Sequence, residues 1–373
     1  MASENRIFTC RPEEHPSVAV FALTSPAFNL AKRIQSQIPN VICYVSEKIL
    51  YNTEEALINS VQAIPFKNIG EGIGKAWNEK FSVIVCIMAT GIVVRSIAPL
   101  IKDKRTDPAV LVIDEAGAFV ISLLAGHIGG ANYWARRIAS AIGAIPVITT
   151  ASDVRGKPAL DVMALQKGCT IIESQKGYGS LACVMRRLLD GEKVHLYDPE
   201  SLVLHELVKH YPSISPLLTS EALSDKQSPG IWVSEKICPH PNWVVIVPRN
   251  LIVGVGCNRG TEAQEIIDLI TRVFDSAKMM TEAIRCIVSI DIKSDEPGLA
   301  QAARYFGCPL FFQKQAKLAN VRVPNPSDEV KKHIGVTSVC EAAALTFHPK
   351  AQLVIPKRKT RNVTVAVAKV PFH

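Results

Sequence analysis

A glycine-rich motif at Gly126–Asn132 combines residue types that bind anions and move protons. It reads Gly-His-Ile-Gly-Gly-Ala-Asn and leads into a helical pattern. Glycines permit a sharp turn and let a ligand approach the backbone, and the N–H groups at a helix start favour an anion. His127 titrates near neutral pH, so it is a candidate general acid or base, although it could equally orient a carboxylate. A purely structural turn is the alternative. The predicted substrate contacts here are Gly126, Gly129, Gly130 and Asn132.

Polar residues also follow the next apolar run. Thr149 and Thr150 come directly after a strand-like segment, and Asp153 stands three residues further on. Ligands of open α/β sheets bind beyond the carboxyl ends of the strands. We therefore expect the two threonines to contact substrate and Asp153 to take part in catalysis. Capping of the following turn is the alternative.

A similar group follows an earlier strand-like run. Thr90 and Gly91 start this group, and Arg95 comes four residues later. The planar guanidinium of an arginine suits bidentate carboxylate binding. We expect these three residues to occupy the position at the sheet edge that is equivalent to that of Thr149 and Thr150. A solvated surface position is the alternative for Arg95.

The C-terminal third contains a second glycine turn, Gly254–Gly260. Its spacing, Gly-x-Gly-x-x-x-Gly, departs from the dinucleotide fingerprint, and the next apolar strand ends in Asp291, too far along for the acid of that fingerprint. We expect backbone N–H groups near Gly256, together with Arg259, to bind an anion, with a structural turn as the alternative. Asp291 and Lys293 are candidate catalytic residues that share one strand face if the strand continues that far.

The composition narrows the class of partner. The chain has 373 residues and a net charge of +8, which fits an anionic small molecule and equally nucleic acid. Its basic residues are dispersed, however, and no zinc-finger or RNA-binding signature appears. The densest basic cluster, residues 357–361, is short. We therefore expect no nucleic-acid partner.

Cysteine use and hydropathy predict the compartment. The ten cysteines include no C-x-x-C pair, which is typical of a reduced, cytoplasmic chain. Cys238 and His240 form the only close Cys/His pair and have no partner pair at zinc spacing, so we expect no metal site. The N-terminal segment lacks the apolar core of a signal peptide, and the longest apolar stretch, residues 81–94, is too short to span a bilayer.

Alternating apolar runs and helical patterns predict an α/β fold. We expect two separate α/β domains with mostly parallel sheets, joined by a smaller α/β middle domain. The predicted boundaries are 15–155, 156–248 and 249–373. The strands predicted in the first domain are 18–23, 41–46, 82–88, 109–114, 118–122 and 145–148, and its helices are 26–38, 70–79 and 130–143.

The other two domains are predicted in the same way. In the middle domain we expect a helix at 179–190 and strands at 194–197 and 243–247. The last domain begins with a strand that runs into its glycine turn. Its further strands are predicted at 286–290, 309–312, 352–355 and 362–368, and its helices at 261–275, 296–306 and 338–346.

Six segments together resemble the cobalamin biosynthesis protein G family, the cobalt-precorrin-5A hydrolases of the anaerobic vitamin B12 pathway. They read TGIVVRSIAPLIKDKRTDPAVLVIDE, LLAGHIGGAN, PVITTASD, GVGCNRGT, SIDIKSDEPGL and GVTSVCEAAAL, the last with Lys357 downstream. The resemblance covers the first and last domains, and the middle fits by position and size. The chain departs from the family pattern at Ser152, where threonine is expected, and at Asn258, where arginine is common. Glu341, in the last segment, is a further predicted substrate contact.

The resemblance implies an activity. Such an enzyme hydrolyses the δ-lactone of cobalt-precorrin-5A, releases acetaldehyde and gives cobalt-precorrin-5B. The substrate is an anionic cobalt-tetrapyrrole that brings its own metal, so no cofactor is expected on the protein. A basic protein with anion sites in two domains suits such a polycarboxylate. The resemblance implies no membrane partner; a homodimer or another enzyme of the pathway is the protein partner considered.

Two other classes of protein stay open at this stage. One is a non-catalytic cobalt-tetrapyrrole carrier, which would bind the macrocycle without turning it over. The other is a phosphosugar or nucleotide-binding α/β enzyme, which would use the glycine turns for phosphate. Spectroscopic titration against a cobalt-tetrapyrrole and against nucleotides separates these classes.

Overall fold

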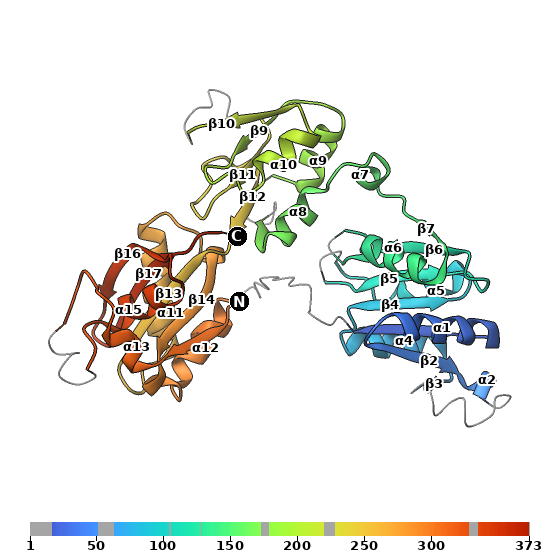
Figure 1. Ribbon diagram of the computed structural model, residues 1–373, viewed down its shortest axis with the longest axis horizontal. Helices are drawn as coiled ribbons and strands as arrows, with labels where there is room; N and C mark the ends of the chain where they lie inside the picture. The colour runs from blue at the N-terminus through green and yellow to red at the C-terminus, as the bar shows by residue number, and fades with distance from the viewer. Residues whose placement is uncertain are drawn as a thin grey trace. The chain divides into compact units, whose positions relative to one another are not determined.

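Figure 1 shows the computed structural model, which describes residues 17–50, 63–103, 106–127, 129–172, 179–219, 228–327 and 335–372. The chain divides into two compact units. We call Cys10–Val162 the N-terminal unit, and the part from Met163 onward the C-terminal unit. The described residues form three sheets, one in the N-terminal unit and two in the C-terminal unit.

The N-terminal unit is built on a seven-stranded sheet with the spatial order β3-β2-β1-β4-β5-β6-β7. Strands β1 to β5 are parallel, β6 is antiparallel to β5, and β7 is parallel to β6. The strands are β1 (Val18–Ala22), β2 (Val41–Ser46), β3 (Ile64–Phe66), β4 (Val83–Ile87), β5 (Ala109–Ile113), β6 (Phe119–Leu124) and β7 (Ile145–Val147).

The reversal between β5 and β6 decides where the candidate residues lie. Only residues 114–118 connect the two strands, and Gly117 adopts a positive φ of 68° in that turn. A parallel pair needs a crossover of a dozen or more residues, so this short link makes a hairpin. The carboxyl ends of β6 and β7 therefore lie at the sheet edge opposite to those of β1, β4 and β5.

Helices cover both faces of this sheet. Helices α1 (Ser25–Gln37) and α6 (Ala131–Ile142) pack on one face, and α4 (Ile69–Asn78) and α5 (Thr90–Ile97) pack on the other. Alternate residues of β1 point to opposite faces, with Val20 in the first core and Phe21 in the second. Every residue of β1, β4 and β5 is buried, as expected for parallel strands between two helix layers.

The C-terminal unit contains two five-stranded sheets. In the order β10-β9-β11-β12-β8, the first has parallel strands except for β8, which is antiparallel to β12. Its strands are β8 (Cys169–Ile172), β9 (Val194–Tyr197), β10 (Ile214–Leu217), β11 (Gly230–Val233) and β12 (Trp243–Pro248). Its helices are α9 (Leu181–Leu189) and α10 (Leu204–His210), and α8 (Leu160–Gln166) spans the boundary between the units.

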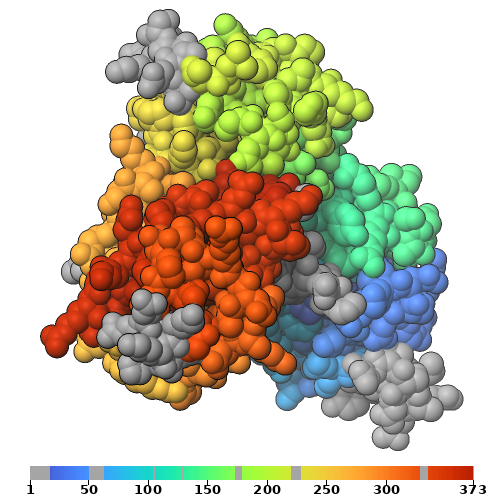
Figure 2. Space-filling model, turned by 60° about the vertical axis from the view of Figure 1, so that its left-hand side comes forward, coloured from blue at the N-terminus to red at the C-terminus, as the bar shows by residue number. Residues whose placement is uncertain are grey.

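The last sheet has the order β15-β14-β13-β17-β16. Strands β13, β14 and β15 are parallel, and β17 and β16 join them as antiparallel strands. The strands are β13 (Leu251–Cys257), β14 (Ile284–Ile290), β15 (Leu310–Gln313), β16 (Gln352–Lys359) and β17 (Val363–Lys369). The helices are α11 (Ala263–Ser276), α12 (Pro297–Tyr305), α13 (Gln315–Ala319) and α15 (Val339–Thr346). These elements, orange to red, lie together at the surface shown in Figure 2.

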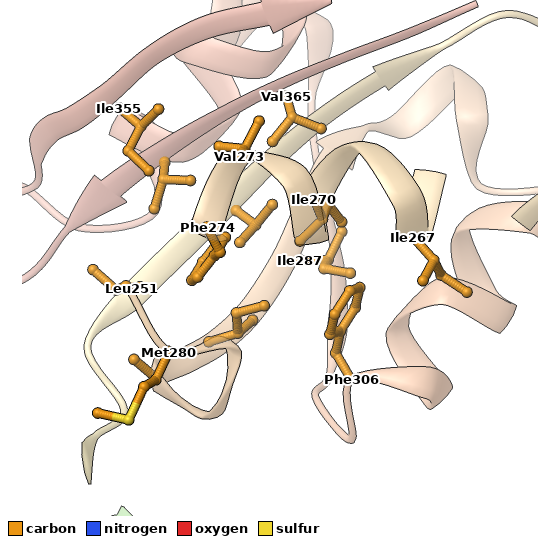
Figure 3. Packing of buried hydrophobic residues seen from close by; sticks show 14 of the residues in the cluster. Leu251, Ile267, Ile270, Val273, Phe274, Met280, Ile287, Phe306, Ile355 and Val365 are labelled. Carbon is orange, nitrogen blue, oxygen red and sulfur yellow. The ribbon is translucent and has the colours of Figure 1, made fainter. Parts of the chain in front are cut away.

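Two helix layers also cover the last sheet. On one side, Ile270 and Phe274 of α11 pack among Ile287, Val365 and their neighbours (Figure 3). On the other side, α15 packs so closely on β13 that a Cβ at Gly254 would lie 1.9 Å from the carbonyl oxygen of Cys340. Only glycine fits that position.

The fold class is confirmed: the chain is α/β with mostly parallel sheets. Each predicted helix and strand with stated bounds is present within two residues, except that β16 continues to Lys359. The elements that sequence reasoning missed are short or weakly patterned, including α5, α7 (Ala151–Val154), α8, α10 and β8. The division into three domains stays a prediction, since the chain separates into two compact units.

Two general properties of the described residues bear on function. Their cysteines are free thiols. No helix among them has the length and apolar character needed to cross a membrane.

Candidate functional site

The glycine-rich motif forms a tight turn between β6 and α6. Ala125 and Gly130 both adopt positive φ, 55° and 83°, and Gly130 is the N-cap residue of α6. A Cβ at Gly129 would lie 2.4 Å from the Cβ of Ala125, and a Cβ at Gly126 would lie 2.9 Å from Asn132 Oδ1. The glycines are therefore required by the turn itself.

This turn places His127 between two carboxylates. Its Nε2 lies 3.1 Å from Asp153 Oδ2, and its Nδ1 lies 3.4 Å from Asp161 Oδ1. Asp153 belongs to the short helix α7 (Ala151–Val154), and Asp161 stands in the first turn of α8. The side chains are 20%, 20% and 10% exposed in the order His127, Asp153, Asp161, so the cluster is sheltered yet reaches solvent.

The two carboxylates control the charge of the imidazole. The hydrogen bond with Asp161 raises the pKa of His127 above its ordinary value, and this outweighs the lowering by burial. The negative charges of Asp161 and Asp153 raise the pKa further. A raised pKa extends the protonated form of the ring, which can donate a proton, to higher pH, and the ring acts as a base only after it has lost that proton.

A hydroxyl group faces the same ring. Ser152 Oγ lies 3.2 Å from Nε2 of His127, and Ser152 is only 3% exposed. Nε2 thus faces a hydroxyl and the carboxylate of Asp153, whereas Nδ1 faces the carboxylate of Asp161.

Asn132 and Arg136 hold the cluster in place. The amide nitrogen of Asn132 donates to Thr150 Oγ1 at 3.0 Å and to Asp153 Oδ2 at 2.9 Å, and its oxygen accepts from the Ser122 hydroxyl at 2.7 Å. Arg136 donates to Asp153 Oδ1 at 2.7 Å. Both oxygens of Asp153 are therefore fixed by cationic or amide donors. This geometry gives Asn132 and Thr150 a bracing position, and direct contact with substrate stays a prediction for them.

Thr90, Gly91 and Arg95 lie at the other edge of the sheet. The prediction of equivalent positions for these residues and Thr149 and Thr150 is wrong, because the β5–β6 hairpin reverses the last two strands. Arg95 is exposed and donates to the carbonyl of Gly91 at 3.0 Å. Thr149 is exposed at its own edge.

Thr90 lines a cavity of about 340 Å³ beyond β1, β4 and β5. This cavity lies where the strand order reverses between β1 and β4, the usual ligand position of a doubly wound sheet. Its floor is apolar, and its polar groups are hydroxyls and carboxylates. The lining residues are Leu23, Thr24, Ile87, Met88, Ala89, Thr90, Ile92, Val112, Asp114, Glu115 and Ile121. No basic side chain lines it, so it suits an uncharged group better than a carboxylate.

In the C-terminal unit, Arg259 is engaged within the protein. It donates to both carboxylate oxygens of Asp295 at 2.6 Å and to the carbonyl of Ile292 at 2.9 Å. This ties the turn after β13 to the segment after β14. Gly256 lies inside β13, where its carbonyl accepts from the Thr364 hydroxyl. Anion binding by Gly256 and Arg259 stays a prediction.

Asp291 and Lys293 do not share a strand face. Strand β14 ends at Ile290, and residues Asp291–Lys293 form the 3-10 helix η3. Asp291 Oδ1 accepts from the amide of Ile292, and Lys293 is buried with its ammonium 3.4 Å from Glu296 Oε1. The strand ends at Ile290, as predicted, so the condition for a shared face is not met, and a catalytic role for the two residues stays a prediction.

Glu341 is fully buried at the start of α15. Its carboxylate accepts from the amide and the side chain of Asn325 and from the amide of Lys357. These bonds hold the loop at Asn325 and strand β16 beside the helix start. The contact of Glu341 with substrate stays a prediction, and its carboxylate has no exposed surface in this structure.

Sequence reasoning missed three members of the His127 cluster. Arg136 could have been found, because it lies four residues after Asn132 and so shares its helix face. Ser152 lies beside a residue that was chosen, Asp153. Asp161 could not be found from the sequence, because α8 has only seven residues and shows no clear helical pattern of apolar residues. Among the described residues, no three His, Cys, Asp or Glu side chains are grouped so as to hold a metal ion.

The fold and the cluster define a class of protein: an α/β enzyme with an acid–base group between two carboxylates at a sheet edge. Three family models, all of proteins of cobalamin synthesis, match most of the chain. The model described as Cobalamin synthesis G N-terminal matches residues 71–153, Cobalamin biosynthesis central region matches 158–248, and Cobalamin synthesis G C-terminus matches 251–368.

The known proteins that resemble this chain also belong to cobalamin biosynthesis. The chain is 34% identical to a cobalt-precorrin-5A hydrolase of Priestia megaterium, over 79% of this chain and 80% of that protein. It is 32% identical to the cobalt-precorrin-5A hydrolase of Salmonella typhimurium, over 96% of this chain and 98% of that protein. The crystal structure of CobE, a protein from the cobalamin (vitamin B12) biosynthetic pathway, is 32% identical over 32% of this chain and 93% of its own, with a TM-score of 0.31. The chain belongs to the cobalamin biosynthesis protein G family, the family of the cobalt-precorrin-5A hydrolases.

Proposed function

We propose that this enzyme hydrolyses the δ-lactone of cobalt-precorrin-5A and releases acetaldehyde, giving cobalt-precorrin-5B. The observation that carries the proposal is the match to a named hydrolase over nearly the whole of both chains. A match confined to one unit would have supported a binding module equally well. The match to the Salmonella typhimurium protein instead covers 96% of this chain, so it takes in residues of both units.

The reaction has two stages whose atoms balance. Water adds across the acyl C–O bond of the lactone, so that the carbonyl carbon gains a hydroxyl and the ring oxygen gains a proton. The two-carbon fragment then carries an alcohol. Loss of the alcohol proton forms the aldehyde as the C–C bond to the macrocycle breaks, and the macrocycle keeps the electron pair and takes up a proton.

The His127 cluster supports the proton transfers of this reaction. Opening of a lactone needs a base for the attacking hydroxyl and an acid for the departing oxygen. An imidazole can take one proton and return it to the other atom, and Asp153 and Asp161 fix its position. Arg136 offsets the negative charge of Asp153, which lessens the repulsion between the cluster and a polycarboxylate.

The same proposal has consequences for the cofactor, the partners and the compartment of the enzyme. Cobalt enters with the substrate, so the protein needs no cofactor of its own. The partner is the anionic cobalt-tetrapyrrole, attracted by the net charge of +8. Other pathway enzymes or a second copy of the chain are the protein partners to test. Free thiols in the described residues support a reducing compartment such as the cytoplasm.

A coupled assay tests the proposal. Purified protein and authentic cobalt-precorrin-5A are incubated with alcohol dehydrogenase and NADH, and NADH loss reports acetaldehyde. The expected result is continuous release by wild type and a much slower rate for His127→Ala. A carrier protein would change the absorption spectrum of the macrocycle yet release no acetaldehyde, and a nucleotide enzyme would not change that spectrum at all.

A further inference from the structure

We propose that Ser152 is the nucleophile of this hydrolase and that it works with His127 and Asp161 as a serine–histidine–aspartate triad. The inference rests on the proposed function and assigns a covalent step to it. Its warrant is the juxtaposition of three side chains from three separate segments: the glycine turn, α7 and the first turn of α8.

The order of contacts around the imidazole matches that of a triad. The nucleophile of a triad bonds to Nε2, and the carboxylate that orients the ring bonds to Nδ1. Here Ser152 Oγ lies 3.2 Å from Nε2, and Asp161 Oδ1 lies 3.4 Å from Nδ1. A serine at 3.2 Å is within reach for proton transfer, since catalytic contacts are often long before substrate binds.

Asp153 competes with Ser152 for Nε2, and its other bonds limit that competition. Asp153 Oδ2 is 3.1 Å from Nε2, but the same oxygen accepts from Asn132 at 2.9 Å and Oδ1 accepts from Arg136 at 2.7 Å. These donors supply a hydrogen bond to each oxygen of Asp153, so Asp153 does not depend on the imidazole for a partner. The ring can therefore give up its Nε2 proton, keep Nδ1–H directed at Asp161, and accept the proton of Ser152.

The covalent step balances. Ser152 Oγ attacks the lactone carbonyl while Nε2 takes the hydroxyl proton. The acyl C–O bond breaks, and the same proton passes to the ring oxygen, which becomes the alcohol of the two-carbon fragment. Acetaldehyde then leaves as described above, and the acyl group stays on Ser152 until water hydrolyses the ester. Departure of acetaldehyde removes the alcohol that could otherwise close the lactone again.

This order of events explains why a serine would serve better than water alone. An opened lactone keeps its alcohol tethered beside the new acyl group, so reclosure is fast. An ester on Ser152 holds the acyl group until the alcohol has been lost as acetaldehyde. Hydrolysis then gives a product that cannot return to substrate.

Two measurements test the proposal together. In the first, Ser152→Ala is compared with wild type and with Ser36→Ala, a serine on α1 whose hydroxyl bonds only within its own helix. We expect Ser152→Ala to lower kcat by a factor on the order of 10³ or more, as loss of a nucleophile does. Ser152→Thr, which keeps a hydroxyl, should retain part of the rate, and Ser36→Ala should match wild type.

In the second, wild type is treated with a fluorophosphonate, which loses fluoride to an activated serine, and peptides are mapped by mass spectrometry. We expect the label on Ser152 in wild type and a much slower reaction in His127→Ala. A kcat of Ser152→Ala within tenfold of wild type, or absence of the label from Ser152 in active wild type, would overturn the proposal. No acetaldehyde from wild type at all would instead reject the proposed function.

Discussion

Replacement of Asp161 by asparagine should slow the enzyme and change its pH profile at the same time. The carboxylate of Asp161 faces Nδ1 of His127 and is the main cause of the raised pKa of that histidine. Asparagine has nearly the same shape but no charge. In the variant, Asp153 is the only carboxylate left beside the ring, and it faces Nε2. The ring therefore prefers a proton on Nε2, the atom that must accept the proton of the nucleophile.

The size of the effect follows from the geometry. In serine proteases the same exchange lowers kcat by about 10⁴, because the wrong tautomer predominates. The contact here is 3.4 Å, longer than the usual range of about 2.7–3.2 Å for such a bond, so Asp161 controls the tautomer less strongly. We therefore expect a loss of about 10² in kcat/KM, which corresponds to about 2.7 kcal/mol of transition-state stabilisation.

The direction of the pH shift is fixed by the same contact. The neutral ring is the reactive form, so kcat/KM should rise with pH and level off above the pKa of His127. Loss of the Asp161 charge lowers that pKa, so the rising limb of Asp161→Asn should lie at lower pH than that of wild type. The raised pKa also stabilises the fold below the unfolded pKa of this histidine, and that contribution is lost as pH rises through the folded pKa.

The assay is acetaldehyde release across a pH series, with Glu71→Gln as the control. Glu71 is an exposed carboxylate on α4 of the same unit, so its exchange removes one charge without touching the cluster. The control should reproduce the wild-type profile. An unchanged plateau for Asp161→Asn, or a limb that stays in place or moves to higher pH, would refute the role given to Asp161.

Two further predictions concern stability and can be checked by denaturant unfolding. Gly254→Ala should destabilise the protein by at least about 2 kcal/mol, because the new Cβ would meet the backbone of α15, whereas Gly74→Ala, with open space around it in α4, should stabilise by about 0.5–1 kcal/mol. Equal midpoints for the two variants would contradict the close packing. Lys369→Met should lower the free energy of unfolding by about 2 kcal/mol, because Lys369 pairs with the carboxylates of Glu235 and Glu200. The loss is smaller than for a fully buried ion pair because this group is only partly buried. A variant as stable as wild type would show that this ion group contributes nothing.

The sequence predicted the elements well wherever local pattern decides structure. The continuous apolar runs of β1, β4 and β5 are buried on both faces, and their hydropathy alone indicates strands. The sequence reasoning did not predict the topology of the first sheet correctly. The three-residue gap between the strands predicted at 109–114 and 118–122 is too short for a parallel connection and implies a hairpin, which contradicts the prediction of equivalent positions for Thr90 and Thr150. That one reversal separates Thr90 from Thr150.

The sequence predicted two residues of the candidate site, His127 and Asp153, but it did not predict Asp161. His127 and Asp153 were chosen from glycine spacing and strand ends, and they lie 3.1 Å apart. Asp161 belongs to a helix too short to leave a periodic pattern, so only the tertiary fold brings it to the ring. Asp291 and Lys293 share no strand face, because the chain turns into a 3-10 helix directly after Ile290 and residue preference alone does not predict such a turn.

A single-turnover experiment with enzyme in excess over cobalt-precorrin-5A tests the central claim most directly. Acetaldehyde is counted, and the macrocycle is identified by mass spectrometry after quenching. The account predicts one equivalent of acetaldehyde for each substrate consumed and a product with the lactone opened and the two-carbon fragment lost. Recovery of intact cobalt-precorrin-5A bound to folded protein, without acetaldehyde, would contradict it.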